Sequence, residues 1–554
     1  MEGSSFGWLS LLPPLIAITL CIVTRNVIPS LVLGIFTGIF IINGFNPITA
    51  LLDTASKYIV GKGVADSWNA GLLVFCLIIG GMVGVMNKSG GIQAVAYQIA
   101  KKAKGKISTQ IATTFLGILI FIDDYASCLI TGNTMRPISD AQKISREKLS
   151  FIVDATAASI SSVIPISTWI AMELGLIQEG LAGVGIKANA IAVFLQSVPY
   201  RFYVLFLVIF MFASFIMRKD YGSMLKAEIR ARKTGEVYDK NSHPMYQDSK
   251  EILPDEGVKG TIWDFILPIL TFIIVTVIGL RYNGWAGLVS DEMKIISSNF
   301  FKVIAEVNGE KIVYTFRDIL GNADSSVVLT WASFIASIEI ILQVIVERRM
   351  SFTKAIDAWI NGVKSMILAV IILALALTLK AVIDEMGTAN YVVEITKPIL
   401  NGAWIPFVVF LIACILSFAT GTSWGTMAIL MPIAIPLAAA ASNANGYLTS
   451  SVVATIGSVL GGAIYGDHCS PISDTTILAS TSAGSDHIAH VTTQLPYAST
   501  VALAGGIFGY LPFAIGVPVW VSLILGTIGI ILFLYFFGKK IDDNGNIIKW
   551  KNYN

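Results

Sequence analysis

Two carboxylates interrupt one of the most apolar parts of this chain, in the segment Tyr465–Thr476. Asp467 and Asp474 follow 69 residues that contain no Asp, Glu, Lys or Arg. A carboxylate at membrane depth is costly, and it persists mainly where it faces a cavity, an ion or a partner. Gly466 and Pro471 lie among hydroxyl residues here, which disfavours a continuous helix. The segment therefore predicts a helix broken around an ion site, with a loop at the membrane surface as the alternative.

The composition is that of a protein embedded in a membrane. Of the 554 residues, 55% are hydrophobic and only 13% are charged, and the mean hydropathy is +0.74. The apolar runs are long and unbroken, which excludes the short alternating segments of a β-barrel. The predicted fold class is therefore an all-α polytopic membrane protein. All the cysteines lie in apolar segments, which predicts reduced, buried thiols at Cys21, Cys76, Cys128, Cys414 and Cys469.

The apolar runs predict about eleven transmembrane helices plus two re-entrant hairpins with polar tips. The first half contains three spans, a hairpin, a broken span and a further span. Inside the second half, a polar insertion contains an alternating stretch that predicts a β-ribbon turning at Asn308-Gly309. The predicted boundaries are 1–217 for the first half, with hairpin 107–140, broken span 149–172 and span 197–217; 218–260 for a linker; 261–517 for the second half, with insertion 281–324, hairpin 404–441 and broken span 448–484; and 518–554 for an extra span and tail.

The basic residues predict the orientation of the chain. Loops rich in Lys and Arg are typical of the cytoplasmic side of a membrane. With the N-terminus outside, every basic loop falls on the cytoplasmic side, together with the C-terminus. These loops are 101–106, 143–148, 218–233, 348–354 and 539–540. The expected location is the bacterial cytoplasmic (inner) membrane, with the linker inside and the 281–324 insertion outside.

The two halves have the same order of parts but start on opposite sides of the membrane. Such inverted repeats are typical of secondary transporters, which bind their solute between the halves near the midplane. A weak similarity between Leu149–Thr168 and Ser451–Thr475 points the same way. The sequence therefore predicts an inverted-topology repeat with one broken helix in each half.

Each hairpin tip is expected to face a broken helix and to form a cup of oxygen atoms with it. Hard cations such as sodium need several oxygen ligands from carboxylates, hydroxyls and backbone carbonyls. The first predicted cup contains Asp123, Asp124, Ser127, Ser159, Ser162 and Ser167, with Asp154 just before the serines. The second contains Thr420, Thr422, Ser423, Asp467, Ser470, Ser473, Asp474 and Thr475. The candidate sodium ligands are Asp123, Ser127, Ser162, Thr422, Asp467 and Ser473.

Competition between a proton and a cation is the chemistry that these cups can perform. Burial raises the pKa of a carboxyl group, so both ions can compete for it at physiological pH. That competition suffices for antiport, because the carboxylate crosses neutralised by one ion or the other. The alternative is that Asp124 or Asp474 only caps a helix. The candidates for binding a cation or a proton are Asp123, Asp124, Asp154, Asp467 and Asp474.

Other motifs are weaker. Helix N-termini near Thr422 and Ser470 could hold an anionic group, and Trp424 and Asn133 are candidates for contact with a solute. His468 is expected to hydrogen-bond within the break or to modulate the pH response. Zinc is disfavoured, because its ligands usually come as separated pairs and the next histidines, His487 and His490, are expected beyond the helix. Without Walker or dinucleotide glycine motifs, an ATP-driven pump or an oxidoreductase is not expected.

Three motifs carry a resemblance to a known family: Phe121-Ile122-Asp123-Asp124-Tyr125, Gly132-Asn133-Thr134-Met135-Arg136-Pro137 and Gly466-Asp467-His468-Cys469-Ser470-Pro471-Ile472-Ser473-Asp474-Thr475-Thr476. They resemble the NhaC-type sodium/proton antiporter family. The resemblance implies the architecture of the ion transporter superfamily, with paired hairpins and broken helices, and it implies cation/proton exchange. The family also includes members thought to move organic acids or amino acids, such as malate–lactate exchangers.

The leading hypothesis is a secondary active sodium/proton antiporter that works by alternating access. The alternative is a sodium- or proton-coupled transporter of a small carboxylate or amino acid. Neither hypothesis makes the protein an enzyme or requires a cofactor. The expected partners are sodium, protons and the lipid bilayer, with a small organic anion or amino acid in the alternative, and no nucleic acid. A homodimer is expected by analogy alone.

Overall fold

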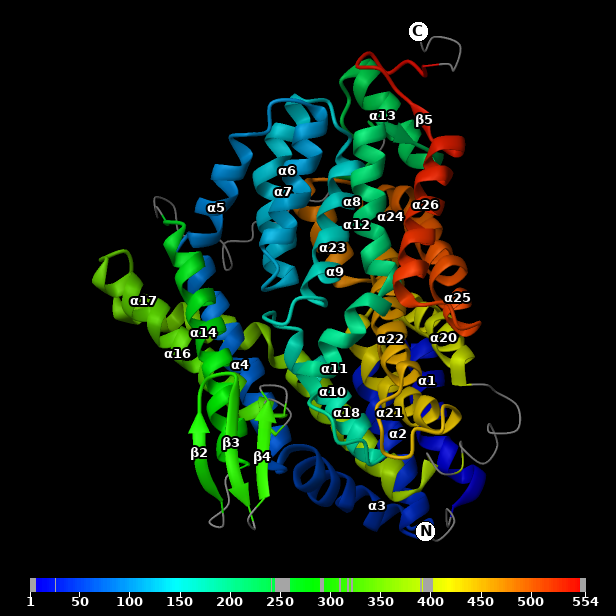
Figure 1. Cartoon of the computed structure of the whole chain (residues 1–554). Coiled ribbons are helices and arrows are strands. Elements are labelled where there is room, and N and C mark those ends of the chain that lie inside the picture. Colours follow the sequence, from blue (N-terminus) through cyan, green and yellow to red (C-terminus); the bar gives the residue numbers. More distant parts are fainter. Residues whose placement is uncertain are drawn as a thin grey trace.

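The computed structural model of this protein is mostly helical, with the two chain ends at opposite ends of the molecule (Figure 1). Within the described residues, eight helices are long and apolar enough to cross a membrane, or nine if the bent pair Ala190–Tyr200 and Phe202–Met217 is one span. The predicted all-α polytopic class is confirmed, and the count of about eleven spans with two re-entrant hairpins stays a prediction. The structure describes residues 6–24, 26–240, 242–244, 260–288, 293–307, 310–315, 318–319, 322–388, 391 and 402–548.

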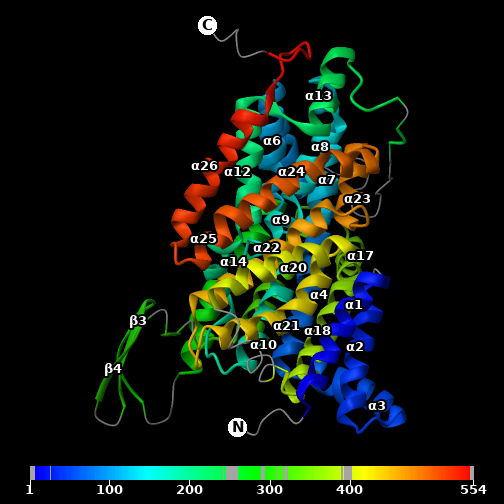
Figure 2. The same cartoon turned by 90° about the vertical axis from the view of Figure 1, so that its right-hand side faces the viewer.

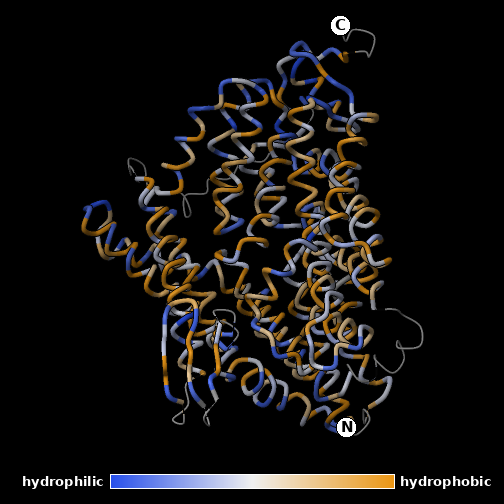
Figure 3. Tube along the Cα trace, viewed as in Figure 1, coloured by the Kyte–Doolittle hydropathy of each residue, from blue (hydrophilic) through white to orange (hydrophobic). Residues whose placement is uncertain are grey.

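Helices in the first half are joined by short turns. Figure 3 shows that their traces are largely hydrophobic, while the turns at the upper end are hydrophilic. A non-helical stretch at 162–169 separates α9 from α10. The helices are α1 (Leu12–Thr24), α2 (Val27–Ile42), α3 (Pro47–Asp53), α4 (Ser67–Lys88), α5 (Gly91–Ala100), α6 (Lys106–Leu119), α7 (Asp124–Ala141), α8 (Arg146–Thr156), α9 (Ala158–Ser161), α10 (Ile170–Gly183), α11 (Ala190–Ser197) and α12 (Phe202–Met217).

The linker begins with a helix, α13 (Gly222–Thr234), and the second half continues in helices. A break at 470–473 separates α22 from α23. The helices are α14 (Trp263–Ala286), α16 (Ser325–Val346), α17 (Phe352–Ser365), α18 (Ile367–Glu385), α20 (Ile405–Thr420), α21 (Ser423–Ala441), α22 (Ser450–Cys469), α23 (Asp474–Ala483), α24 (His487–Ala504), α25 (Leu511–Ala514) and α26 (Val519–Phe537).

Two small sheets lie at opposite ends of the molecule (Figures 1 and 2). At the lower end, β2 (Lys294–Ser298), β3 (Lys302–Val307) and β4 (Glu310–Thr315) form an antiparallel sheet. The pairing of β3 with β4 confirms the predicted ribbon, whose turn at Asn308-Gly309 lies outside the described residues. At the upper end, β1 (Lys219–Asp220) pairs with β5 (Lys539–Lys540), which ties the C-terminal tail to the start of the linker.

The two hairpin tips have the same local structure, an N-cap residue that begins the second helix. Asp123 and Thr422 precede α7 and α21 with almost the same backbone angles, φ −147° and ψ 128° against φ −148° and ψ 124°. Each side chain accepts a hydrogen bond from the backbone N–H three residues later, which caps the helix. Gly421 has φ +67°, a left-handed conformation that favours glycine and ends α20 sharply.

Helix α22 breaks within the predicted segment Tyr465–Thr476, but after Gly466 and Asp467 rather than at them. It continues through Asp467 to Cys469, and the break follows at 470–473. Gly466 does not end the helix. It is needed for close packing, because a Cβ atom there would lie 2.4 Å from the backbone nitrogen of Phe418 on α20. Its missing side chain allows α20 and α22 to pack closely, as small residues do between membrane helices.

The second helix of each hairpin packs against the broken helix of the other half. Helix α7 contacts α23, and α21 contacts α10. At the second of these interfaces, the rings of Trp169 and Trp424 meet edge to face at 5.5 Å. This cross-packing brings the two breaks and the two hairpin tips to the middle of the molecule.

Candidate functional site

Asp467 is buried in the last turn of α22, against the tip of the second hairpin. Its Oδ2 accepts hydrogen bonds from the hydroxyl of Ser423, at 2.5 Å, and from the Ser423 backbone N–H, at 3.2 Å. Its Oδ1 is buried and has no hydrogen-bond partner among the described residues. A buried carboxylate oxygen without a donor is costly. The second hairpin thus holds one oxygen of Asp467 and leaves the other available.

Asp123 and Asp124 lie at the tip of the first hairpin. Oδ1 of Asp123 accepts a hydrogen bond from the Thr168 hydroxyl at 3.4 Å, and the Thr168 N–H donates to the carbonyl of Ile122 at 2.8 Å. Asp124 is buried on the first turn of α7, one residue after the cap. This hairpin tip therefore contacts the broken helix of its own half, as predicted.

The same tip also reaches the other half of the protein, which joins the two predicted cups into one acidic cluster. The hydroxyl of Tyr125 donates to Asp474, and the Cys128 thiol faces the Thr475 carbonyl at 3.7 Å. The charge of Asp124 interacts with those of its neighbours Asp123, Asp474 and Asp467. We call this set the acidic cluster: Asp123, Asp124, Asp467 and Asp474.

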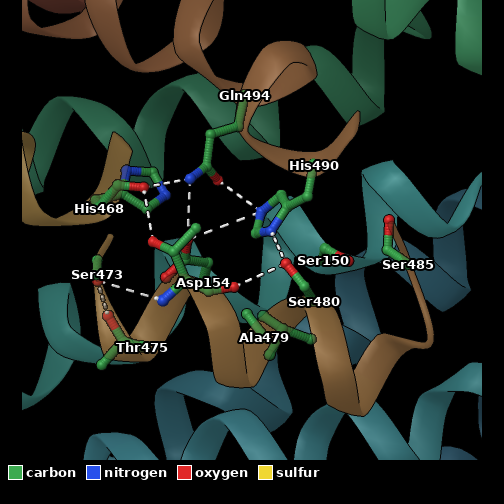
Figure 4. Close-up of polar contacts among 12 residues, drawn as sticks. Ser150, Asp154, His468, Ser473, Thr475, Ala479, Ser480, Ser485, His490 and Gln494 are labelled. Carbon is green, nitrogen blue, oxygen red and sulfur yellow. Dashed lines mark hydrogen bonds and ion pairs between the residues drawn. The ribbon is translucent and has the colours of Figure 1, made fainter. Parts of the chain in front are cut away.

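Asp154 lies on α8, fully buried, and its charge interacts with those of Asp467 and Asp474. Its Oδ2 accepts a hydrogen bond from the amide of Gln494 on α24 at 2.9 Å, which Figure 4 shows. Its Oδ1 has no hydrogen-bond partner within the described part of the chain. Asp154 is thus next to the acidic cluster and is held by an uncharged side chain.

A cavity of about 790 Å³ opens onto the acidic cluster. Asp123, Tyr125 and Asp474 form its inner wall, and α4 and α17 form the opposite wall. The α17 side contributes Lys354, Asp357 and Lys364. The volume lies within the range of small-molecule sites, roughly 300–1,000 Å³. Charges of both signs therefore line a space that connects to two carboxylates of the cluster.

The break in the first half contains a built-in positive charge. Arg201 and Glu173 form an ion pair at 3.0 Å in which both side chains are fully buried. The same guanidinium donates to the carbonyl of Ser162 within the break. Because Arg201 already donates to the Ser162 carbonyl, we leave Ser162 out of the proposed sodium site.

Most of the other predicted hydroxyls bond to backbone carbonyls. Ser167 donates to Ser161 at 2.6 Å, and Ser470 donates to Phe418 at 2.9 Å. Ser473 caps α23, the role that the sequence allowed for Asp474, and its hydroxyl lies 3.0 Å from that of Thr475. The remaining predicted residues occupy these positions: Ser127 donates to Gly117 at 3.4 Å, Thr420 donates to Leu416 at 2.9 Å, Asn133 is half-buried on α7, and Ser159 has a buried hydroxyl without a partner among the described residues.

His468 is buried and bonds within the core, since its Nδ1 lies 2.7 Å from the Tyr203 hydroxyl. His487 and His490 lie beyond α22 and α23, on α24, as expected, and His490 is buried there beside Asp154. Sequence reasoning also missed Gln494, the donor to Asp154, and the Arg201–Glu173 pair. Glu173 and Arg201 could have been found as isolated charges beside apolar spans. Gln494 is uncharged and gave no such indication.

Within the described residues, no group of three or more His, Cys, Asp or Glu side chains has the geometry to hold a metal ion. A family model described as the Na+/H+ antiporter family matches residues 163–515, which is 353 of the 554 residues. This chain belongs to the Na+/H+ antiporter family. Its protein is thus a multi-pass membrane transporter and not an enzyme. A second family model, described as a C4-dicarboxylate anaerobic carrier, matches residues 22–139.

Relatives of this antiporter-family chain include both uncharacterized and named proteins. An uncharacterized protein of Haemophilus influenzae is 34% identical over 92% of this chain and 91% of its own length. A malate-2H+/Na+-lactate antiporter of Bacillus subtilis is 39% identical, over 15% of this chain and 17% of its own length. The Na+/H+ antiporter NhaC of Alkalihalophilus pseudofirmus is 25% identical, over 28% of this chain and 38% of its own length.

Two solved transporter structures are similar over most of the chain. MtrF of Neisseria gonorrhoeae, described as one of a class of antimetabolite efflux pumps, is 14% identical, with a TM-score of 0.41 over 85% of this chain and 84% of its own. The YdaH transporter of Alcanivorax borkumensis is 13% identical, with a TM-score of 0.44 over 85% of this chain and 90% of its own.

Proposed function

We propose that this protein exchanges sodium for protons across the bacterial cytoplasmic membrane by alternating access. The observation that carries the proposal is the acidic cluster, where four carboxylates from both halves meet around two hairpin tips. Several carboxylates in one low-dielectric place cannot all stay ionised without compensation. A sodium ion or a proton supplies that compensation, so each ion displaces the other.

The proposed sodium ligands are oxygens around the second break. Asp467 offers its unpartnered Oδ1, and Thr422 and Ser473 cap the two helix N-termini nearby. Hydroxyl and carbonyl oxygens complement a carboxylate as ligands for a hard cation. Asp123 and Asp124 complete the cluster from the other half, and Asp154 is the proposed proton-binding carboxylate beside it. Sodium and the proton then compete because both neutralise the same group of charges.

The proposal includes an orientation in the membrane and an inverted repeat. The basic loops support a cytoplasmic position for the end that carries α13 and β5. The cross-packing of α7 on α23 and α21 on α10 supports an inverted repeat. In that arrangement the two hairpins and the two breaks move as paired units, and the 790 Å³ cavity is the aqueous approach from the basic side.

The experiment that tests the function is sodium-triggered proton movement in proteoliposomes, with a pH dye and no organic solute. We expect a sodium jump to change the internal pH with the wild-type protein. Asp467→Asn should reduce the response to background while the protein still purifies as a folded species. Asp357→Asn is the matched control, because Asp357 lines the same cavity outside the acidic cluster. A full response from Asp467→Asn would contradict the sodium site.

A second candidate function is coupled transport of a small carboxylate. The cavity favours it, because Lys354 and Lys364 offer positive charge and Asp123 and Asp474 lie opposite them. The short match to a malate-2H+/Na+-lactate antiporter and the match to a C4-dicarboxylate carrier model agree with that chemistry. If sodium alone moves no protons, but sodium with a dicarboxylate or hydroxy acid does, this second function replaces the first.

A further inference from the structure

A continuous chain of hydrogen bonds connects the buried Asp154 to the partly exposed end of α24. His490 Nδ1 lies 2.8 Å from the Ser480 hydroxyl, and the same hydroxyl lies 3.1 Å from His487 Nδ1. His490 Nε2 lies 2.9 Å from Gln494 Oε1 and 3.7 Å from Asp154 Oδ2. Figure 4 shows Ser480 and Gln494 on either side of the His490 ring, with Asp154 below.

The partners of the two rings fix where their protons are. Gln494 uses its NH₂ group as a donor to Asp154 Oδ2 and to the His468 carbonyl, so its Oε1 faces His490 as an acceptor. His490 therefore carries a hydrogen on Nε2. His487 Nε2 lies 2.7 Å from the carbonyl of Pro471, which can only accept, so His487 also carries a hydrogen on Nε2.

With both rings neutral, Ser480 has too few hydrogens. A neutral imidazole with a hydrogen on Nε2 has a bare Nδ1 that can only accept. Ser480 thus faces two bare ring nitrogens and the Thr476 carbonyl, at 2.8 Å, with a single hydroxyl hydrogen. One additional proton, on Nδ1 of one histidine, supplies the missing hydrogen. That histidine then donates to the Ser480 oxygen, and Ser480 donates to the other histidine.

We propose that His487, Ser480 and His490 form a proton relay between the cytoplasm-facing end of α24 and Asp154. A proton on His487 Nδ1 moves to the Ser480 oxygen while the hydroxyl hydrogen moves to His490 Nδ1. His490 then releases its Nε2 hydrogen to the Asp154 carboxylate. The separation of 3.7 Å exceeds a hydrogen bond, so this last transfer requires His490 and Asp154 to approach each other. The relay rests on the proposed antiport function, for which it supplies the proton route.

The charges around the relay favour entry of the proton at His487. Next to His487, Asp486 accepts hydrogen bonds from the N–H groups of Ala489 and His243, both at 2.8–2.9 Å. Partial burial raises the pKa of Asp486, but the hydrogen bonds from these donors lower it by more. The pKa of Asp486 is therefore below its ordinary value. Asp486 therefore remains negative beside the entrance. The groups that face His490 are Asp154 from α8, His468 from α22, and His487 and Gln494 from its own helix.

Ser480 provides the sharpest test, because relay and packing roles predict opposite results for two variants. Ser480→Ala removes the hydroxyl, and we expect sodium-triggered proton movement in proteoliposomes to slow by about tenfold or more, in line with the value of a positioned proton-transfer group. Ser480→Thr keeps the hydroxyl and should stay within about twofold of wild type. A packing role predicts the reverse, because threonine is larger than serine at a buried position.

Sodium binding is measured separately, as the sodium-dependent rise in Tm of the purified protein. We expect Ser480→Ala and His487→Gln to keep that rise while losing rate. His487 is partly exposed, so its substitution tests the relay even if Ser480→Ala does not fold. If the wild-type protein exchanges sodium for protons and Ser480→Ala and His487→Gln do so equally fast, the relay is overturned but the proposed antiport function is not. A wild-type protein that moves no protons in response to sodium contradicts the proposed function instead.

Discussion

The two helix breaks of this protein are neutralised differently. In the first break, Arg201 is a permanent cation: it bonds to the Ser162 carbonyl and pairs with Glu173. In the second break, Asp467 accepts hydrogen bonds from Ser423, and its Oδ1 has no donor within the described chain. The first break thus contacts a buried ion pair whose charges balance each other, whereas the second has a negative charge that a mobile ion must balance.

This difference separates structural stability from transport. A buried guanidinium that bonds to both a carboxylate and a carbonyl holds the first break in one conformation. The second break has no such fixed counter-charge, so its electrostatic energy depends on what is bound. We infer that the first break acts as a rigid support and that the second binds the exchangeable sodium. The following substitutions test that division.

The largest expected effect comes from removing the fixed cation. Arg201→Met leaves Glu173 buried without its partner, and breaking one side of a buried ion pair typically costs about 3–5 kcal/mol. We expect a marked fall in Tm measured by thermal denaturation in detergent. The double substitution Arg201→Met with Glu173→Leu should recover much of that loss, because no unpaired charge remains. An Arg201→Met protein as stable as wild type would remove the contrast between the breaks.

A smaller effect is expected at Ser423, and Ser417 offers a matched control. Both hydroxyls lie near the carbonyl of Ala463, at 3.3 and 2.5 Å, but only Ser423 also bonds to Asp467. A hydrogen bond to a charged group contributes about 1.5–3 kcal/mol. Ser423→Ala should therefore change the sodium concentration for half-maximal exchange by about tenfold or more, whereas Ser417→Ala should change it little. Equal effects of the two substitutions would indicate that packing, not the Asp467 contact, matters here.

The smallest of these effects is a shift in pH dependence. Asp123→Asn removes one negative charge from the acidic cluster, so the remaining carboxylates lose their protons more readily. We expect the pH profile of exchange to move to lower pH by about one unit, measured as the rate of sodium-triggered proton movement over a pH series. Asp357→Asn, on the far wall of the cavity, should leave the profile in place. An unchanged profile for Asp123→Asn would assign the competing proton to another carboxylate.

The sequence was informative wherever a local rule applied. Carboxylates among apolar residues drew attention to Asp123 and Asp467, and polar residues between apolar arms located both hairpin tips. Gly466 was misleading, because a glycine that permits close helix packing and one that ends a helix look alike without the partner helix. The contact between Tyr125 and Asp474 joins residues 349 positions apart. No local pattern encodes such a pairing, so two separate cups were expected where the structure has one joined cluster.

The cysteines have a practical consequence for labelling studies of this transporter. Cys76, Cys128, Cys414 and Cys469 are all buried free thiols. Thiol reagents react with cysteine thiolates at accessible positions, so we expect these four buried residues to be labelled little. The fifth cysteine, Cys21, has a side chain outside the described part of the chain, and we would replace it before single cysteines are introduced. Reporter cysteines at Lys104 or on the walls of the 790 Å³ cavity could then follow alternating access in an otherwise native protein.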